Sequence, residues 1–148
     1  LIRACKPLDE NSLYCNLLQC DHFRDSCVVA ELDGRIVGWI SGYLPPAAED
    51  TLFVWQVAVS EAARGHGLGG RMLKQILSRP ECAGVSRMQT TITADNAASW
   101  ALFSRFAERM GATLDSAPHF IRTEHFRGQS ATEHMVTIQL AQPLRSVA

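Results

Sequence analysis

The chain has 148 residues, of which 47% are apolar. This length and composition allow one compact domain with a hydrophobic core and leave too little chain for two ordinary ones, so we expect a single domain over residues 1–148. The 14 Lys and Arg residues nearly balance the 15 Asp and Glu residues. This balance gives no broad positive field, so nucleic acid is not an expected partner.

The sequence contains no apolar run of membrane-spanning length and no signal-peptide pattern, so we expect a soluble protein without a membrane partner. Its cysteines are an odd number and form no CxxC pair: Cys5, Cys15, Cys20, Cys27 and Cys82. This pattern is typical of reduced thiols in the cytoplasm, and it predicts neither a disulfide nor a metal site.

The first elements that the sequence predicts are a helix and a hairpin. Apolar residues recur at three- and four-residue spacing over residues 11–20, which predicts a short amphipathic helix capped by Asn11 or Ser12. Residues 27–44 contain two β-branched segments around Asp33-Gly34. An Asp-Gly pair supplies the positive φ of a type I′ turn, so these segments are predicted to be antiparallel strands.

The middle of the chain predicts a strand, a helix and a second strand. Residues 51–60 are apolar at both even and odd positions, which indicates a buried central strand. Residues 68–77 carry a helical apolar stripe that ends before Pro80, and residues 86–94 are rich in Thr and Ile. Strand, helix and strand in this order predict a right-handed crossover between parallel strands.

The last third of the chain predicts a helix, a loop and a strand. Asp95 or Asn96 can cap a helix that stops at Gly111. Residues 115–129 show no regular pattern and are predicted to be a long loop, which is also a candidate subunit interface. Residues 133–140 alternate apolar and polar side chains, which predicts an antiparallel strand.

A glycine-rich segment, Arg64-Gly65-His66-Gly67-Leu68-Gly69-Gly70, joins the predicted central strand to its helix. The unpaired backbone N–H groups and the positive end of the helix dipole then converge on one point, where they can bind phosphate oxygens. Glycine lets a diphosphate approach these amides, and Arg64 can neutralise its charge. A simple flexible helix start is the alternative, but each helical glycine costs up to about 1 kcal/mol, so this many indicate a function.

Three phosphate-binding motifs compete for this segment. A Walker A loop needs Gly-Lys-Ser/Thr, whereas the chain has Gly-Arg-Met at residues 70–72. Residues 65–70 satisfy GxGxxG, but a dinucleotide-binding fold places that motif after its first strand and supplies an acid about 20 residues later. Here a hairpin comes first, and residues 88–91 are Met, Gln, Thr and Thr. Both of these motifs are therefore disfavoured.

The third option is the GNAT acetyltransferase superfamily, whose phosphate loop, Gln/Arg-x-x-Gly-x-Gly/Ala, resembles Arg64, Gly67 and Gly69. Residues 96–99 and 102–112 look like its second cofactor element. The resemblance implies an α/β (α+β) fold in which helices flank a mixed, mostly antiparallel central sheet. It also implies acetyl-CoA as co-substrate and no metal. The cofactor-binding residues implied are Val57, Ala58, Val59, Arg64, Gly65, His66, Gly67, Leu68, Gly69, Gly70, Asn96, Ser99 and Phe103.

Residues 7–15, 50–59 and 93–99 resemble the branch of this superfamily that acetylates L-2,4-diaminobutyrate in ectoine biosynthesis, and nearly the whole chain is similar. The resemblance implies that acetyl passes from acetyl-CoA to the γ-amine of L-2,4-diaminobutyrate. The products would be N4-acetyl-L-2,4-diaminobutyrate and CoA. A cytoplasmic homodimer with a role in osmoprotection is also implied.

A diamino acid carries two ammonium groups and a carboxylate, so its pocket needs acids, an aromatic face and a hydrogen-bond donor. The candidates are Asp9, Tyr14, Trp55, Glu133 and His134. The resemblance assigns the first three to the substrate, and the last two stand in a less distinctive segment. Structural alternatives remain open: an acid at a helix start for Asp9, core positions for the aromatic residues, and solvated strand ends for the last two.

Acetyl transfer also needs proton transfer. An alkyl amine with a pKa of about 10 is almost all ammonium at neutral pH, and deprotonating it costs about 4 kcal/mol. The candidate bases are Asp9, Glu133 and His134, acting directly or through water. Many family members place a Tyr at the position of Phe103 as general acid. With Phe here, the thiolate either leaves unprotonated or takes a proton from water.

Two other functions remain open from the sequence. One is an N-acetyltransferase for another small primary amine, such as a polyamine, an aminoglycoside or a protein N-terminus. The other is a non-catalytic acyl-CoA-binding domain, because residues 52–59 lack a carboxylate and Phe103 replaces a Tyr. Turnover of a panel of amines distinguishes these possibilities.

Overall fold

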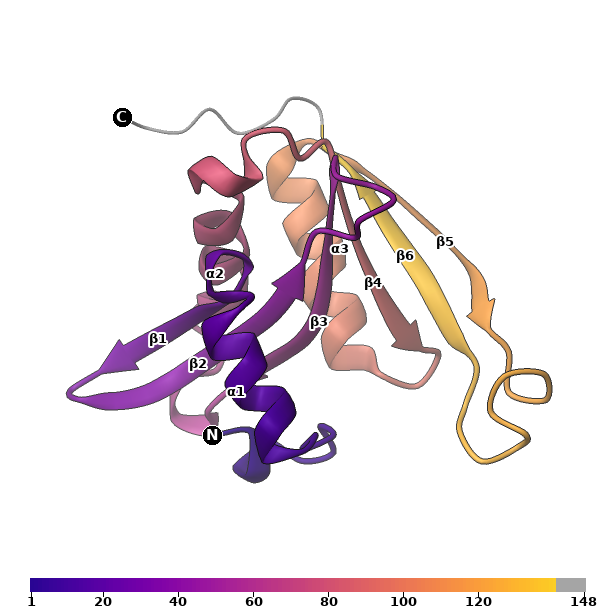
Figure 1. The fold of residues 1–148 in the computed structure, drawn as a ribbon, viewed down its shortest axis with the longest axis horizontal. Helices are drawn as coiled ribbons and strands as arrows, with labels where there is room; N and C mark the ends of the chain where they lie inside the picture. The colour runs from indigo at the N-terminus through magenta and orange to yellow at the C-terminus, as the bar shows by residue number, and fades with distance from the viewer. Residues whose placement is uncertain (141–148) are drawn as a thin grey trace. The chain divides into compact units, whose positions relative to one another are not determined.

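The computed structural model describes residues 1–140, which fall into two compact units, residues 1–85 and residues 86–140. Figure 1 labels their helices and strands. Each unit contains three strands in antiparallel pairs, and we describe each unit by itself. The single domain predicted for residues 1–148 stays a prediction.

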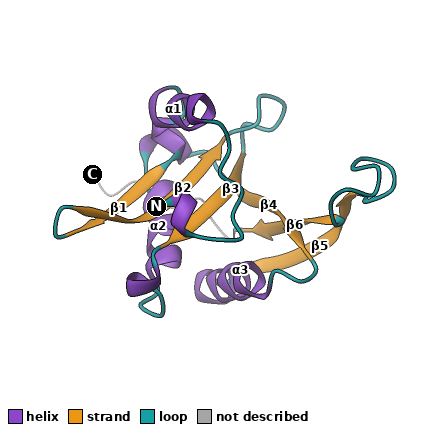
Figure 2. Cartoon of the chain, turned by 90° about the horizontal axis from the view of Figure 1, so that it is seen from below, coloured by secondary structure: helices purple, strands orange, loops and turns teal. Residues whose placement is uncertain are grey.

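The first unit is a three-stranded sheet between two helices. The hairpin strands β1 and β2 pair with each other, and β2 also pairs with β3. Helix α1 lies on one face of this sheet and α2 on the other (Figure 2). The elements, with η for a short 3₁₀ helix, are η1 (Ile2–Ala4), α1 (Leu13–Asp21), η2 (Arg24–Ser26), β1 (Val28–Leu32), β2 (Arg35–Tyr43), β3 (Thr51–Val59), η3 (Glu61–Ala63), α2 (Leu68–Leu77) and η4 (Pro80–Cys82).

Local sequence signals account for the ends of these elements. The hydroxyl of Ser12 accepts a hydrogen bond from the backbone N–H of Cys15 at 3.0 Å, so Ser12 is the cap of α1, one of the two predicted residues. Asp33 and Gly34 have φ values of 50° and 72°, as the predicted hairpin turn requires. The predicted hairpin is therefore confirmed.

Strand β3 contains a bulge at Trp55. Ser41 of β2 pairs with Gln56, and the next residue, Gly42, pairs with Val54, so Trp55 has no partner on β2. Two residues of β3 therefore occupy the space of one, and the alternation of side chains changes face at this point. Residues 52, 54, 56 and 58 are all buried, and because of the bulge the first two face one side of the sheet and the last two face the other; Trp55 between them is 47% exposed.

The two faces of the first sheet bury different side chains. On the α1 side, Cys5 and Cys27 pack with Trp39 and Ala58. On the other side, α2 buries an apolar face with 3% or less exposure, made of Met72, Leu73, Ile76 and Leu77. This stripe was predicted from its helical spacing, and it holds the start of α2 at the end of β3.

The second unit packs one helix on a three-stranded sheet (Figure 2). Strand β6 lies between β4 and β5 and is antiparallel to both. The side chain of Asn96 caps α3, and Gly111 ends it with a φ of 61°, as predicted. The elements are β4 (Arg87–Thr93), α3 (Ala97–Met110), β5 (Thr113–Phe120) and β6 (Glu133–Gln139).

The predicted loop over residues 115–129 is wrong in its first part. Residues 113–120 form β5, which pairs with β6 along its length, and the loop begins only at residue 121. Most side chains of β5 are exposed, and its pairing with β6 shifts register between Pro118 and Phe120. A solvated strand with a proline carries no alternating apolar pattern, so the pattern analysis could not detect it.

The five cysteines are free thiols. Burial raises the pKa of the Cys27 and Cys82 thiols, which makes them poor nucleophiles. Within residues 1–140, no three His, Cys, Asp or Glu side chains gather in a way that could hold a metal ion. In the same range, none of the helices combines the length and the apolar character that crossing a bilayer requires.

Gly42 tests the packing beside the bulge. A Cβ there would lie 2.8 Å from the carbonyl oxygen of Phe53 and 3.2 Å from that of Ser26, and neither backbone atom can move aside freely. We expect Gly42→Ala to lower the free energy of unfolding by about 1–3 kcal/mol in urea denaturation. Gly84→Ala is the control, because its Cβ would meet nothing within 4 Å. Equal stability of the two variants would contradict this account.

Candidate functional site

The glycine-rich segment forms the turn between β3 and α2, as predicted. Gly65 and Gly67 have φ values of 81° and 69°, in the left-handed region that favours glycine. The first helical hydrogen bond runs from Arg71 N to Gly67 O at 3.1 Å, so the N–H groups of residues 67–70 have no acceptor within α2. A Cβ at Gly65 or at Gly70 would meet nothing within 4 Å, so the turn is open. It can therefore receive an anion such as a diphosphate.

Arg64 is anchored beside this turn. Its Nε donates a hydrogen bond to the carbonyl of Val59 at 3.2 Å, and the same carbonyl accepts one from Cys5 Sγ at 3.5 Å. The terminal nitrogens of the Arg64 guanidinium have no partner within residues 1–140, so they are available to an anion. His66 in the turn and Leu68, the first residue of α2, line a cavity of about 540 Å³ together with residues of β1.

The three residues of β3 that the sequence assigns to the cofactor differ in exposure. Ala58 is buried with 1% exposure, and Val57 and Val59 are half-buried. Only their backbone groups can offer hydrogen bonds to a ligand. The assignment of these residues to the cofactor stays a prediction.

Three predicted substrate residues of the first unit are accessible. Asp9 is exposed, Tyr14 in the first turn of α1 is 70% exposed, and Trp55 is 47% exposed. Neither aromatic residue is therefore a core side chain. Helix α1 starts at Leu13 and has no acid in its first turn, so Asp9 is not a helix-start acid either. These structural alternatives are excluded, and the three side chains are free to bind a ligand.

Glu133 and His134 lie on opposite faces of the second sheet, because neighbouring strand residues alternate. His134 shares a face with Ile92 of β4, and its ring meets that of Trp100 on α3 edge-on, with centroids 6.5 Å apart. Its Nδ1 is buried and has no partner in the described part of the chain. Glu133 pairs with Thr93 and faces the other way. The sheet therefore does not bring the two predicted bases together.

Burial raises the pKa of Glu133. A hydrogen bond with the side chain of Thr91 and the charge of His134 act against this shift, while Asp95 adds to it. A carboxylate with a raised pKa is a stronger base than an exposed one, so it accepts a proton from an ammonium group more readily.

The predicted second cofactor element begins α3. Asn96 Oδ1 accepts a hydrogen bond from the N–H of Ser99 at 3.1 Å, so this side chain satisfies the start of its own helix. Phe103 is 2% exposed on the buried face of α3. Both residues have a structural role in α3, and their contact with a cofactor stays a prediction.

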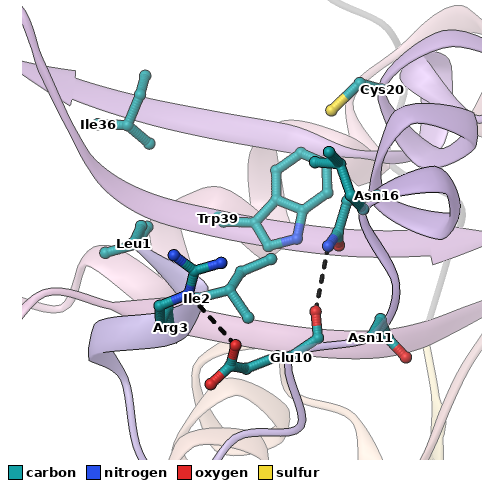
Figure 3. Close-up of a pocket in the computed structure, with 10 residues that line it drawn as sticks. Leu1, Ile2, Arg3, Glu10, Asn11, Asn16, Cys20, Ile36 and Trp39 are labelled. Carbon is teal, nitrogen blue, oxygen red and sulfur yellow. Dashed lines mark hydrogen bonds and ion pairs between the residues drawn. The ribbon is translucent and has the colours of Figure 1, made fainter.

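Sequence analysis missed a group of polar side chains next to Asp9. Gln56 Nε2 donates a hydrogen bond to the Asp9 carbonyl at 2.6 Å, and Asn16 Nδ2 donates one to the Glu10 carbonyl at 3.1 Å. The Glu10 and Asn16 groups meet at the edge of a cavity of about 450 Å³ in front of Trp39 (Figure 3). One signal was present: Gln56 is the single polar residue in the otherwise apolar run 52–59.

Comparisons with known proteins agree with this geometry. Residues 2–107 match the sequence profile described as "Acetyltransferase (GNAT) family". The chain is 51% identical to the L-2,4-diaminobutyric acid acetyltransferase of Methylotuvimicrobium alcaliphilum, covering 93% of this chain and 80% of that protein. It is 49% identical to the protein of the same name from Halomonas elongata, covering 93% of this chain and 72% of that protein.

A solved structure is also similar. It is the diaminobutyrate acetyltransferase EctA from Paenibacillus lautus, in complex with its substrate L-2,4-diaminobutyric acid and coenzyme A. The TM-score is 0.86 at 34% identity, and the match covers all of this chain and 88% of that one. The predicted fold class, a mixed sheet with flanking helices, is confirmed. With a family profile matched over more than half of its length and a relative at 51% identity, the chain belongs to the acetyltransferase (GNAT) family.

Proposed function

We propose that the chain transfers the acetyl group of acetyl-CoA to the γ-amine of L-2,4-diaminobutyrate and releases N4-acetyl-L-2,4-diaminobutyrate and CoA. This reaction is a step of ectoine biosynthesis and would serve osmoprotection. The observation that carries the proposal is the likeness of the whole chain to EctA, whose structure holds this amine and coenzyme A. The relatives at 51% and 49% identity bear the name of the same activity.

Acetyl-CoA would be held first by its diphosphate. The open N–H groups of residues 67–70 and the positive end of α2 offer hydrogen bonds and favourable charge, and Arg64 adds a guanidinium. Residues 57–59 would hold the pantetheine by their backbone. Asn96, Ser99 and Phe103 would contribute from the start of α3. When bound, acetyl-CoA supplies the activated thioester.

The amine would be bound by exposed side chains of the first unit. Asp9 offers a carboxylate for one ammonium group, and the indole of Trp55 offers a face to which a cation is attracted. Tyr14 adds a phenol that can donate to the substrate carboxylate. Exposures of 70% for Tyr14 and 47% for Trp55 support these roles, because a ligand can reach both.

Glu133 is the best candidate for the base that accepts the ammonium proton. Its raised pKa supports this role, whereas His134 packs against Trp100. The free amine would then attack the thioester carbonyl, and backbone N–H groups near Val57 would stabilise the oxyanion. Phe103 cannot donate a proton to the departing thiolate, so the thiolate would leave unprotonated or take a proton from water.

The setting of the enzyme is also part of the proposal. Five free cysteines support a cytoplasmic location, where thiols stay reduced. A homodimer is supported by β5, an exposed strand that carries Phe120 with 39% exposure. Small primary amines and acetyl-CoA are the proposed partners, and neither nucleic acid nor membrane is among them.

The choice of amine is tested with a panel of acceptors. We expect kcat/KM for L-2,4-diaminobutyrate to be at least 100-fold higher than that for putrescine, an aminoglycoside or an N-terminal peptide. The assay measures the release of the CoA thiol. A site whose acids and donors pair with both ammonium groups and the carboxylate of a diamino acid leaves some of these groups unpaired when another amine binds, which accounts for a ratio of this size. If another amine has the higher kcat/KM, that amine and not L-2,4-diaminobutyrate is the substrate. CoA binding without turnover of any amine would indicate a non-catalytic domain.

The phosphate loop is tested with Gly67→Val. A side chain at this position would cover the N–H groups at the start of α2, so we expect the Kd for CoA in calorimetry to rise at least 100-fold. Gly34→Val is the matched control, because Gly34 has a similar φ of 72° but lies in the β1–β2 hairpin. Equal affinity of Gly67→Val and wild type would place the diphosphate elsewhere.

The base is tested with Glu133→Gln. Because the pKa of Glu133 is raised, the wild-type kcat/KM should fall with decreasing pH already above the ordinary range of a glutamate, and the variant should lose this limb and most of kcat. The folded protein also binds this proton more tightly than the unfolded chain, so this residue lowers stability as pH rises. Glu133→Gln should therefore unfold at a higher temperature than wild type at pH 8. Unchanged kcat would remove Glu133 from the mechanism.

A further inference from the structure

The segment between η1 and α1 is held by two side-chain amides. Gln56 Nε2 from β3 donates to the carbonyl of Asp9 at 2.6 Å, and Asn16 Nδ2 from α1 donates to the next carbonyl, that of Glu10, at 3.1 Å. Figure 3 shows the amide of Asn16 reaching the Glu10 carbonyl. We call Gln56 and Asn16 the amide clamp. It fixes the backbone of residues 9–12 from the sheet side and from the helix side.

The geometry of this segment is not that of a free loop. Asn11 has a φ of 54°, a left-handed conformation that a non-glycine residue adopts at a cost. Directly after it, Ser12 uses its hydroxyl to cap α1. Backbone strain at Asn11 persists only where surrounding contacts determine it, and the amide clamp supplies such contacts on the two residues before it.

Gln56 is costly where it stands. Its side chain is only 4% exposed, in the apolar strand β3, and its Oε1 has no partner in the described part of the chain. An apolar side chain of the same size would avoid the cost of burying this amide. The bond from Nε2 to Asp9 is therefore what the amide contributes, and it joins residues that lie far apart in sequence.

Gln56 also connects two residues of the proposed amine site. It directly follows Trp55, the bulged residue of β3, and its side chain binds the backbone of Asp9. Gln56 is thus joined to Trp55 by a peptide bond and to the backbone of Asp9 by a hydrogen bond. Movement of the Asp9 backbone away from β3 requires this hydrogen bond to break.

We propose that Gln56 is a positioning residue for the acceptor amine: its hydrogen bond to the Asp9 carbonyl sets the place of the Asp9 carboxylate relative to Trp55. This inference rests on the proposed function, because it assumes that Asp9 and Trp55 bind the amine. Among residues 1–140, the side chain of Gln56 has a hydrogen bond to Asp9 and none to the phosphate loop, residues 64–70, so we expect it to affect the binding of the amine and not that of acetyl-CoA. It touches no substrate itself.

The test compares two buried glutamines. Gln56→Met keeps the length of the side chain and removes the donor to Asp9. Gln19→Met makes the same change on α1, where Gln19 is 3% exposed and neither polar atom of its side chain has a partner within residues 1–140. We expect Gln56→Met to raise KM for the amine at least tenfold, with KM for acetyl-CoA within twofold of wild type. Gln19→Met should change neither constant more than twofold.

Hydrogen exchange supplies a readout that needs no substrate. We expect the backbone amides of Cys15 and Asn16, which donate hydrogen bonds to the hydroxyl and the carbonyl of Ser12, to exchange at least tenfold faster in Gln56→Met than in wild type and at wild-type rates in Gln19→Met. Equal rises of KM in the two variants, unchanged exchange, or faster exchange without a change of KM would each overturn the positioning role. If the wild-type enzyme acetylates a different amine, the proposed substrate is wrong. The role of Gln56 is then tested in the same way, by KM for that amine together with the hydrogen-exchange data.

Discussion

The start of α2 is the constraint on which the rest of the structure depends. A helix leaves its first N–H groups without acceptors, and a side chain or a ligand must satisfy them. At Gly67 the chain has no side chain that could do so, and the left-handed φ of 69° turns the backbone directly from β3 into α2. The glycines therefore leave the positive end of the helix to an external anion, and the buried stripe of α2 keeps that end in place against the sheet.

The bulge in β3 sets the second requirement, the place of the acceptor. In a regular strand, the buried residues 52, 54, 56 and 58 would all share one face. The extra residue, Trp55, has no partner on β2 and is exposed, and it brings Gln56 to the other face, where its side chain binds the Asp9 segment. One local irregularity thus provides both an accessible aromatic ring and the attachment of an acidic segment from the start of the chain.

Local signals predicted most of the fold. Asp33-Gly34, the cap Ser12 and the stop Gly111 each act within a few residues, and each was found at its predicted position. Strand β5 was missed because pairing with β6, and not burial, makes it a strand. An exposed strand leaves no hydrophobic period in the sequence, so only the folded chain reveals it.

The candidate site was predicted less completely than the fold. The phosphate loop is continuous in sequence and therefore readable, whereas the bond between Gln56 and Asp9 joins distant segments and leaves only an isolated polar residue as a trace. The separation of Glu133 from His134 followed from the predicted strand itself, since neighbours on a strand face opposite ways. Chemistry alone groups the two residues as candidate bases, whereas the strand puts them on opposite faces of the sheet.

The bulge also limits how this chain can change its length. In a loop, one inserted or deleted residue alters little beyond the loop, and the connection at residues 44–50 has that freedom. Inside β3, one residue inserted or deleted without a compensating bulge would shift the pairing of the rest of the strand with β2 by one residue. Every side chain on one side of the change would then face the opposite layer. Strand register thus fixes the number of residues between the connection at 44–50 and the glycine-rich turn at 64–70. Insertions and deletions are tolerated only in segments outside β3.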